Sequence, residues 1–337
     1  MSITAPRTNE NPFMPPFLHP IEDDLRRVEE VLHDELSSPV QTAAGVSRHV
    51  LDAGGKRLRP SLVILCARAC SPNPESDRLA KIAASVELIH MATLAHDDVI
   101  DSAESRRGRK TANSHWGNHI SILTGDFMLA KAVSLMAQDG DIRIIQALSH
   151  ATIAMTEGEI SQIETQGDTR TTMTSYLSII RGKTAEFMSA CCRIGTILTS
   201  APSSSEEALA EYGMNLGLAF QITDDLLDLI GDPAQTGKPI GSDIREGKIT
   251  MPIILAMEKA APPDQLKLES ILRAGGATLD DMEFIRGLAE STSAIESTRD
   301  AADRYVAQAI GHLQTLPDSE ARNSLEELAH YILSRKS

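Results

Sequence analysis

Hydrophobic positions recur at intervals of three and four residues along most of this 337-residue chain. Between residues 77 and 101 the recurring positions are Leu79, Ile82, Ala83, Val86 and Ile89. Such spacing puts apolar side chains on one face of an α-helix. The same spacing continues over residues 20–53, 118–138, 141–166, 172–199, 205–230, 249–260, 264–273, 278–290, 293–315 and 318–335. The pattern therefore predicts an all-α protein.

Short clusters of glycine, proline and serine interrupt this pattern, as at Ala53-Gly54-Gly55 and Pro262-Pro263. None is long enough to be a linker between domains, and no segment alternates as a strand does. We therefore expect one all-α domain over residues 19–337. A disordered leader is expected over residues 1–18, because that segment contains proline and asparagine but lacks the apolar core of a signal peptide.

Composition narrows the choice of partners and compartment. The net charge is −15, which argues against a nucleic-acid partner, since such binding needs a basic surface. The four cysteines form no CxxC or Cys/His ligand pattern, so we expect buried thiols in a reducing cytoplasm. No run of 18 apolar residues occurs, so no membrane span is expected.

Two acidic stretches carry the candidate chemistry. The first is Asp97-Asp98-Val99-Ile100-Asp101, at the end of an apolar helix. Asp97 and Asp101 are one turn apart on one helix face, where like charges repel unless a cation lies between them. Carboxylate oxygens suit Mg²⁺, which also shares the phosphate oxygens of substrates. The alternative is a solvated acidic helix end.

The second stretch is Asp224-Asp225-Leu226-Leu227-Asp228, with Gln221 one turn earlier. It also follows an apolar helical segment, where acids need partners. The DxDxDG spacing of a calcium loop is absent from both stretches. Two such stretches in one chain favour a magnesium-bound diphosphate over two solvated helix ends.

Basic residues accompany both stretches. Arginine can bind phosphate through two parallel hydrogen bonds, and lysine acts as a point charge. The candidates are the loop Gly54-Gly55-Lys56-Arg57-Leu58-Arg59-Pro60, the run Arg106-Arg107-Gly108-Arg109-Lys110, and Lys183, Lys238 and Lys248. Their placement beside the acidic stretches predicts a diphosphate site.

Taken in order, these motifs resemble the trans-isoprenyl diphosphate synthases, or polyprenyl synthetases, over residues 18–335. The resemblance also rests on Gly125-Asp126-Phe127-Met128-Leu129-Ala130, Gly182-Lys183-Thr184-Ala185, Phe220-Gln221-Ile222-Thr223 and Gly237-Lys238-Pro239. It implies a single helical bundle of the isoprenoid-synthase type around a central cavity, three Mg²⁺ ions and a homodimer. It also leaves room for transient membrane contact during product release.

The resemblance assigns roles residue by residue. The metal set is Asp97, Asp98, Asp101, Asp224, Asp225 and Asp228. The isopentenyl diphosphate set is Lys56, Arg59, His90 and Arg107. The allylic diphosphate set is Arg106, Lys183, Thr184, Gln221, Lys238 and Lys248. Lys183, Thr184 and Gln221 are also the expected catalytic residues. Lys110 and Glu186 depart from the family's common residues.

The implied reaction joins isopentenyl diphosphate head-to-tail to an allylic diphosphate. Ala92 and Thr93 lie one turn before Asp97 and are small, whereas the short-chain enzymes of the family carry aromatic residues there. The resemblance therefore implies a hexaprenyl to decaprenyl product, octaprenyl-like, of the kind found in quinone side chains. A shorter geranylgeranyl or farnesyl product remains an alternative.

Two other readings stay open. A class I terpene cyclase shares the logic of the first acidic stretch, but its second metal motif is usually of the Asn/Ser/Glu type. A non-catalytic partner subunit of a heteromeric synthase would be expected to lose an acidic stretch or its basic set. Both stretches are intact in this chain.

Overall fold

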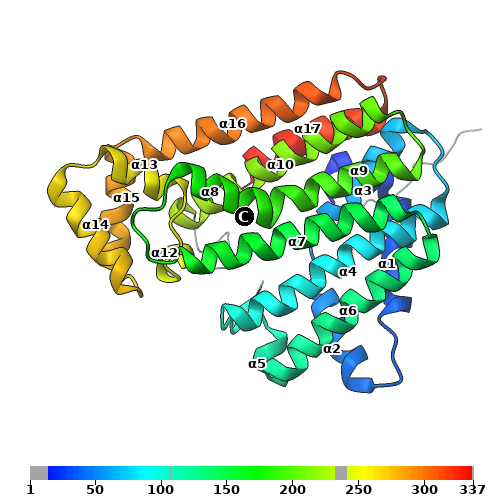
Figure 1. Ribbon diagram of the computed structural model, residues 1–337, viewed down its shortest axis with the longest axis horizontal. Coiled ribbons are helices and arrows are strands. Elements are labelled where there is room, and N and C mark those ends of the chain that lie inside the picture. The colour runs from blue at the N-terminus through cyan, green and yellow to red at the C-terminus, as the bar shows by residue number, and fades with distance from the viewer. Residues whose placement is uncertain (1–13, 107, 232–240, 336–337) are drawn as a thin grey trace, which may run out of the picture.

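The structure is a computed structural model that describes residues 14–106, 108–231 and 241–335. Long helices lie roughly side by side, with α7 across the middle of the view and α13, α14 and α15 gathered at one end (Figure 1). An all-α fold is confirmed. Two strands of two residues each, β1 (Ser105–Arg106) and β2 (Arg109–Lys110), form a small hairpin.

The helices begin and end as follows, in chain order. They are a 3₁₀ helix (Pro16–Ile21), α1 (Glu22–Glu35), α2 (Gln41–Asp52), α3 (Leu58–Cys70), α4 (Ser76–Ile100), α5 (Ala112–Trp116), α6 (Asn118–Asp139), α7 (Ile142–Glu164), α8 (Met173–Ile180), a π-helical turn (Arg181–Ala185), α9 (Glu186–Leu198), α10 (Ser203–Ile230), α12 (Ser242–Arg245), α13 (Met251–Lys259), α14 (Pro262–Ala274), α15 (Leu279–Ser291), α16 (Ala294–Leu313) and α17 (Glu320–Ser334).

Buried apolar side chains form two clusters. One is built mainly from α1, α3, α4, α6, α9 and α17, and the other from α8, α13, α15 and α16. Helix α10 contributes to both, through Leu216 in the first and Leu226 in the second. Tyr305 and Leu333 pack against both clusters. The second acidic stretch therefore sits on a helix that both clusters hold in place.

Three boundaries differ from the sequence expectation. The first 3₁₀ helix begins at Pro16, and Phe17 and Leu18 are buried, so order begins before the predicted end of the leader at residue 18. Residues 1–13 lie outside the described part. The segment 20–53 is divided between α1 and α2, because Pro39 cannot continue a helix. The segment 172–199 is divided by the π-helical turn.

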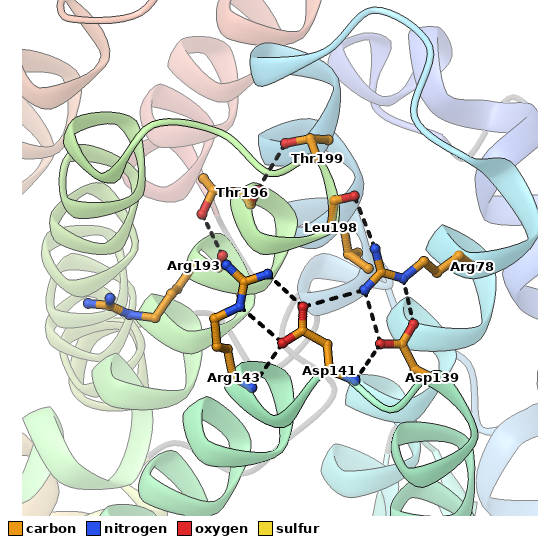
Figure 2. Close-up of polar contacts among 8 residues, drawn as sticks. All are labelled: Arg78, Asp139, Asp141, Arg143, Arg193, Thr196, Leu198 and Thr199. Atoms are coloured by element: carbon orange, nitrogen blue, oxygen red, sulfur yellow. Dashed lines mark hydrogen bonds and ion pairs between the residues drawn. The ribbon is translucent and has the colours of Figure 1, made fainter.

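An ion-pair network ties together the beginnings of α4 and α7 and the end of α6 (Figure 2). Arg78 donates from Nε and Nη2 to the two oxygens of Asp139, at 2.6 and 3.0 Å, and its Nη2 lies 3.7 Å from Asp141. Arg143 in turn pairs with Asp141 at 2.6 Å. The hydrogen bond from Arg78 lowers the pKa of Asp139, and that from Arg143 lowers the pKa of Asp141.

Helix α6 is the one helix among the described residues that is long and apolar enough to cross a membrane by those two criteria. Its most apolar window is 39% buried against the rest of the chain. It packs along α4 and contains the charged residues Asp126 and Lys131. Core helices of soluble proteins meet the same criteria, so the expectation of no membrane span stays a prediction.

Candidate active site

The first acidic stretch lies at the C-terminal end of α4, with Asp101 directly after its last residue. Asp98 is buried, and its Oδ1 accepts a hydrogen bond of 2.8 Å from Nε of Arg106. Asp97 is half-buried and Asp101 is exposed. The two residues that the sequence put on one helix face therefore remain accessible. The intervening Asp98 is held by an arginine.

The β1–β2 hairpin brings Arg106 back to the stretch that precedes it. Gly108 turns the chain with a φ of 74°, a conformation that L side chains rarely adopt. Ser105 then pairs with Lys110, and Arg106 with Arg109. The carbonyl of Lys110 accepts a hydrogen bond of 2.7 Å from Nε2 of His49. Lys110 thus belongs to the hairpin that positions Arg106.

The Asp97 carboxyl lies in a strongly acidic setting. Burial raises the pKa of Asp97 to about 6; the positive charge of Lys183 opposes the shift, whereas Glu159 and Asp101 add to it. Removing water from a carboxylate penalises its charged form, and nearby negative charges do the same. A divalent cation would relieve both effects.

The second acidic stretch lies near the end of α10. Asp224 has a half-exposed side chain, and its Oδ1 lies 3.4 Å from Nη2 of Arg335. Asp228 accepts backbone hydrogen bonds from Ser242 and Asp243 at 3.1 and 3.0 Å. Asp228 therefore fixes the start of α12, while Asp224 faces outward and already attracts a cationic group.

Asp225 is buried and both its oxygens are engaged. The Tyr176 hydroxyl donates to Oδ2 at 2.6 Å, and Nε2 of Gln221 donates to Oδ1 at 2.8 Å. Burial raises the pKa of Asp225 to about 6, against the effect of these two hydrogen bonds. Asp225 is thus held by two side chains in the interior, whereas the half-exposed Asp224 lies beside Arg335.

Two lysines from the second half of the chain lie within electrostatic reach of the first acidic stretch. Burial alone would lower the pKa of Lys248, but Asp243 and Glu246 outweigh it, and Asp101 of the first stretch also raises that pKa. The positive charge of Lys183 acts to lower the pKa of Asp97. Positive charges from the second half of the chain therefore lie close to the first acidic stretch.

Lys183 and Thr184 occupy the π-helical turn between α8 and α9. Such turns often occur at functional sites, since they redirect side chains within a helix. A Cβ on Gly158 would lie 2.7 Å from the backbone nitrogen of Lys183, so only glycine permits this approach of α7. As a result Nζ of Lys183 reaches Glu159 at 2.5 Å.

Glu186, which departs from the family's common residue, pairs with Arg181 at 3.1 Å. The two residues are five apart and bracket the π-helical turn. A π-helix closes its hydrogen bonds at that same five-residue separation. The pair therefore lies across the turn that carries Lys183 and Thr184.

The predicted isopentenyl diphosphate residues lie at the start of α3 and on α4. Nη1 of Arg59 donates to Nε2 of His90 at 3.1 Å. The ammonium group of Lys56 lies 5.2 Å from the Tyr331 ring centre. Arg107 and Lys238, also predicted to bind substrate, lie outside the described residues.

The neighbouring Arg57 has a different role. Its guanidinium binds Glu29 at 2.5 Å and the buried Glu87 at 2.9 Å. Its φ of 47° places the residue in the left-handed region at the start of α3. These ion pairs hold the loop in the conformation that presents Lys56 and Arg59.

The two predicted chain-length residues differ in burial. Ala92 is 2% exposed and belongs to the first hydrophobic cluster. Thr93 is half-buried, and its hydroxyl donates to the carbonyl of His90 at 2.8 Å. A larger side chain at residue 92 would have to displace its packed neighbours.

Sequence reasoning missed four residues that the structure brings to this region: Glu159, Tyr176, Asp243 and Arg335. Tyr176 lies two turns before Lys183 and could have been read as a core aromatic. Glu159 faces Lys183 only because α7 and the π-helical turn pack through glycines. Arg335 reaches Asp224 from the far end of the chain, a contact that periodicity does not indicate.

The carboxylates of the two acidic stretches fit a metal ion whose coordination is completed by the substrate. Within residues 14–106, 108–231 and 241–335, no group of three or more His, Cys, Asp or Glu side chains is close enough to hold one ion. The accessible carboxylates are hard oxygen donors, as Mg²⁺ and Ca²⁺ require. Mg²⁺ commonly takes one or two carboxylates plus phosphate oxygens. The arrangement therefore suits ions shared with a diphosphate.

Comparison with known proteins agrees with this chemistry. The polyprenyl synthetase family model matches residues 40–287, and the chain belongs to that family. Heptaprenyl diphosphate synthase component 2 from Geobacillus stearothermophilus is 38% identical over 317 residues, 94% of this chain and 97% of that protein. Octaprenyl diphosphate synthase from Escherichia coli K12 is 36% identical over 313 residues, 93% of this chain and 96% of that protein.

A solved structure extends the likeness to three dimensions. The polyprenyl synthase from Caulobacter crescentus CB15, complexed with calcium and isoprenyl diphosphate, matches with a TM-score of 0.91 at 36% identity. The match covers 95% of this chain and 97% of that one. The chain is therefore a prenyltransferase enzyme of the polyprenyl diphosphate synthase class.

Proposed function

We propose that this enzyme condenses isopentenyl diphosphate head-to-tail onto an allylic diphosphate, repeatedly, to make a hexaprenyl to decaprenyl diphosphate. The observation that carries the proposal is that positive charges lie beside three acids that are not fully buried: Lys183 acts on Asp97, Lys248 lies within electrostatic reach of Asp101, and Arg335 lies 3.4 Å from Asp224. Such a site suits a diphosphate with bound metal ions, because the metal ions would neutralise the carboxylates and the phosphate groups would neutralise the basic side chains.

The proposed cofactor is Mg²⁺, three ions per site. Asp97, Asp101 and Asp224 are the proposed direct ligands, because their carboxylates remain accessible. Mg²⁺, when bound, withdraws charge from the departing diphosphate. The remaining acids are proposed to support the ligands through the partners described above; they are Asp98 with Arg106, Asp225 with Tyr176 and Gln221, and Asp228 with the start of α12.

The chain's own residues bind and orient the two substrates. Arg106, Lys183, Gln221, Lys238 and Lys248 are proposed to hold the allylic diphosphate. Lys56, Arg59, His90 and Arg107 are proposed to hold isopentenyl diphosphate. Fixed charges and dipoles of this kind act without reorganising during the reaction.

The bond changes balance within the two substrates. The allylic carbon–oxygen bond breaks, and its electron pair leaves with the diphosphate. The isopentenyl double bond supplies the pair for the new carbon–carbon bond, and a proton passes to the departing diphosphate. The Thr184 hydroxyl donates to Gln221 Oε1 at 2.8 Å, so the oxygen lone pairs of Thr184 remain available to steady the allylic cation.

Small side chains at Ala92 and Thr93 support a long product. The growing prenyl chain is proposed to run along α4 away from Asp97, past these positions. Ala92 packs in the first hydrophobic cluster, so a tyrosine there is proposed to push its neighbours into that path, and we expect products several prenyl units shorter. Thr93→Ser keeps the position small and serves as the matched control. An unchanged product length from Ala92→Tyr would show that the prenyl chain does not run past residue 92.

The direct test uses the purified full chain alone with Mg²⁺, labelled isopentenyl diphosphate, and either farnesyl or geranylgeranyl diphosphate as starter. We expect six to ten prenyl units in the chromatographed product, centred near eight. A product that stops at three or four units would sink the chain-length proposal. No product from any starter would rule out a self-sufficient enzyme.

A homodimer is proposed from an unpartnered apolar face on α6 and α7. Leu123 and Val133 are 62% and 52% exposed, and Ile153 and Ile160 are 56% and 52% exposed. Patches of this kind mark protein interfaces. The face also accounts for the incomplete burial of α6. Light scattering should give twice the chain mass, and Ile153→Glu should give monomers if this face is the interface.

A second candidate is the catalytic subunit of a heteromeric synthase. The observation that favours it is the 38% identity to a protein named as component 2 of a heptaprenyl synthase. Activity of the chain by itself separates this candidate from a self-sufficient enzyme. We favour the self-sufficient enzyme, and we propose the cytoplasm as its compartment.

A further inference from the structure

A line of side-chain hydrogen bonds runs from the protein interior to the proposed reacting centre. It begins at Tyr176, which is 3% exposed and whose hydroxyl donates to Asp225 Oδ2 at 2.6 Å. Nε2 of Gln221 donates to Asp225 Oδ1 at 2.8 Å. Oγ1 of Thr184 donates to Gln221 Oε1 at 2.8 Å. The line connects three helical elements: Tyr176 lies on α8, Asp225 and Gln221 on α10, and Thr184 in the π-helical turn.

The line has a fixed direction. An amide can present either its oxygen or its NH₂ group to a neighbour. An ionised carboxylate only accepts, so Asp225 binds the NH₂ group of Gln221 and leaves the amide oxygen to face Thr184. Rotation of the Asp225 carboxylate would release that constraint. The Tyr176 hydroxyl holds the second carboxylate oxygen and opposes this rotation.

We propose that Tyr176 is a positioning residue for prenyl transfer. Through Asp225 it fixes the orientation of the Gln221 amide, and thereby the direction in which Thr184 presents its oxygen to the allylic cation. Tyr176 itself touches neither substrate. This inference rests on the proposed function, because it assumes that Thr184 and Gln221 face the reacting carbon.

A second buried tyrosine offers a matched control. Tyr212 is fully buried, and its hydroxyl donates at 2.7 Å to the backbone carbonyl of Leu325. It lies on α10 more than two turns before Gln221, and its hydrogen bond ends on α17. Tyr176→Phe and Tyr212→Phe therefore remove the same atom from similar surroundings. Only the first change reaches Asp225.

The experiment measures single-turnover rates, steady-state kcat and KM, and unfolding midpoints for the full chain with Mg²⁺, farnesyl diphosphate and isopentenyl diphosphate. For Tyr176→Phe we expect kcat to fall about 10- to 100-fold, as is usual when a supporting hydrogen-bond partner is lost. KM for both substrates should stay within about twofold, because uniform substrate binding is untouched. Tyr212→Phe should lower the unfolding midpoint by about as much as Tyr176→Phe does, because each loses one buried hydrogen bond, but it should leave kcat unchanged.

A double variant tests whether Tyr176 acts through Gln221. In a Gln221→Leu background the amide is gone, so adding Tyr176→Phe should change the single-turnover rate by less than about twofold. The proposal is overturned if Tyr176→Phe leaves kcat unchanged, raises only KM, loses no more activity than Tyr212→Phe, or acts equally strongly without Gln221. An inactive wild type would instead remove the proposed function, and this inference with it.

Discussion

At its N-terminal end, α4 holds Arg78 against Asp139 and Asp141; at its C-terminal end it carries Asp97 among other acids. Arg78 and Asp97 are about 28 Å apart along the helix, from a rise of 1.5 Å per residue. At the first end, hydrogen bonds from arginines lower the pKa of both aspartates. At the second end, burial raises the pKa of Asp97 to about 6.

Aspartate side chains thus serve two purposes in one helix bundle. Near Arg78 each carboxylate meets its counter-charge within the protein, so the ionised form favours the folded state. Near Asp97 burial and the neighbouring acids outweigh the positive charge of Lys183, so ionisation opposes folding; the remaining counter-charge is proposed to come from metal and substrate. Perturbed carboxylates of the second kind are typical of functional sites. The contrast separates carboxylates that stabilise the fold from carboxylates that are proposed to bind metal.

The largest expected effect is on activity at the Asp97 end. Asp97→Asn removes a proposed metal ligand of nearly the same shape. Loss of several kcal/mol of transition-state stabilisation corresponds to a fall in kcat of roughly 10³-fold. The measurement is labelled isopentenyl incorporation at saturating Mg²⁺.

Asp139→Asn is the matched control for that change. It makes the same chemical change beside the N-terminal end of α4, and the activity of the variant should stay within about twofold of the wild type. An Asp97→Asn enzyme with near-normal kcat would show that this carboxylate is not a ligand, and the contrast between the two ends would fail.

A smaller effect is expected on stability at the Arg78 end. Arg78→Ala removes both hydrogen bonds to Asp139 and leaves that carboxylate, 6% exposed, without its partner. We expect a loss of about 2 kcal/mol in the free energy of unfolding, with kcat unchanged. Denaturant unfolding measures it.

Arg143→Ala tests the exposed member of the same network. Arg143 is 54% exposed, and pairs of this kind contribute less than about 1 kcal/mol. A larger loss for Arg143→Ala than for Arg78→Ala would contradict the picture of Arg78 as the centre of the network (Figure 2).

The smallest effect is a pH dependence. The folded-state pKa of Asp139 is lower than its ordinary value, so its contribution to stability is present above pH 4 and is lost as the pH falls through the folded-state pKa. Asp139→Asn should therefore cost about 1 kcal/mol at pH 7 and progressively less toward pH 2. A cost independent of pH would mean that packing, rather than charge, accounts for it.

Much of the fold was predictable because it depends on local periodicity. The helix that ends at Asp101 and the helix that carries Asp224 follow from three- and four-residue spacing alone. The accessibility of Asp97 and Asp101 also agrees with their shared helix face. Short-range order of this kind needs no knowledge of which helices pack together.

The rest depends on contacts between distant segments. Tyr176 and Asp225 are 49 residues apart, and Arg78 and Asp139 are 61 apart. Their pairing follows from how helices pack, which spacing along one helix does not encode. The π-helical turn was missed for a related reason, since one extra residue per turn barely changes the apolar pattern over 172–199.

The most direct test of the contrast is the free energy of unfolding of Asp97→Asn in EDTA at pH 7. Because the folded-state pKa of Asp97 is raised, its cost to stability appears as the pH rises above about 4 and is complete above about 6. At 1.36 kcal/mol per pKa unit, the variant should be more stable than the wild type by up to roughly 3 kcal/mol, and the two should converge near pH 3. A wild type as stable as the variant at pH 7, or more stable, would contradict the account.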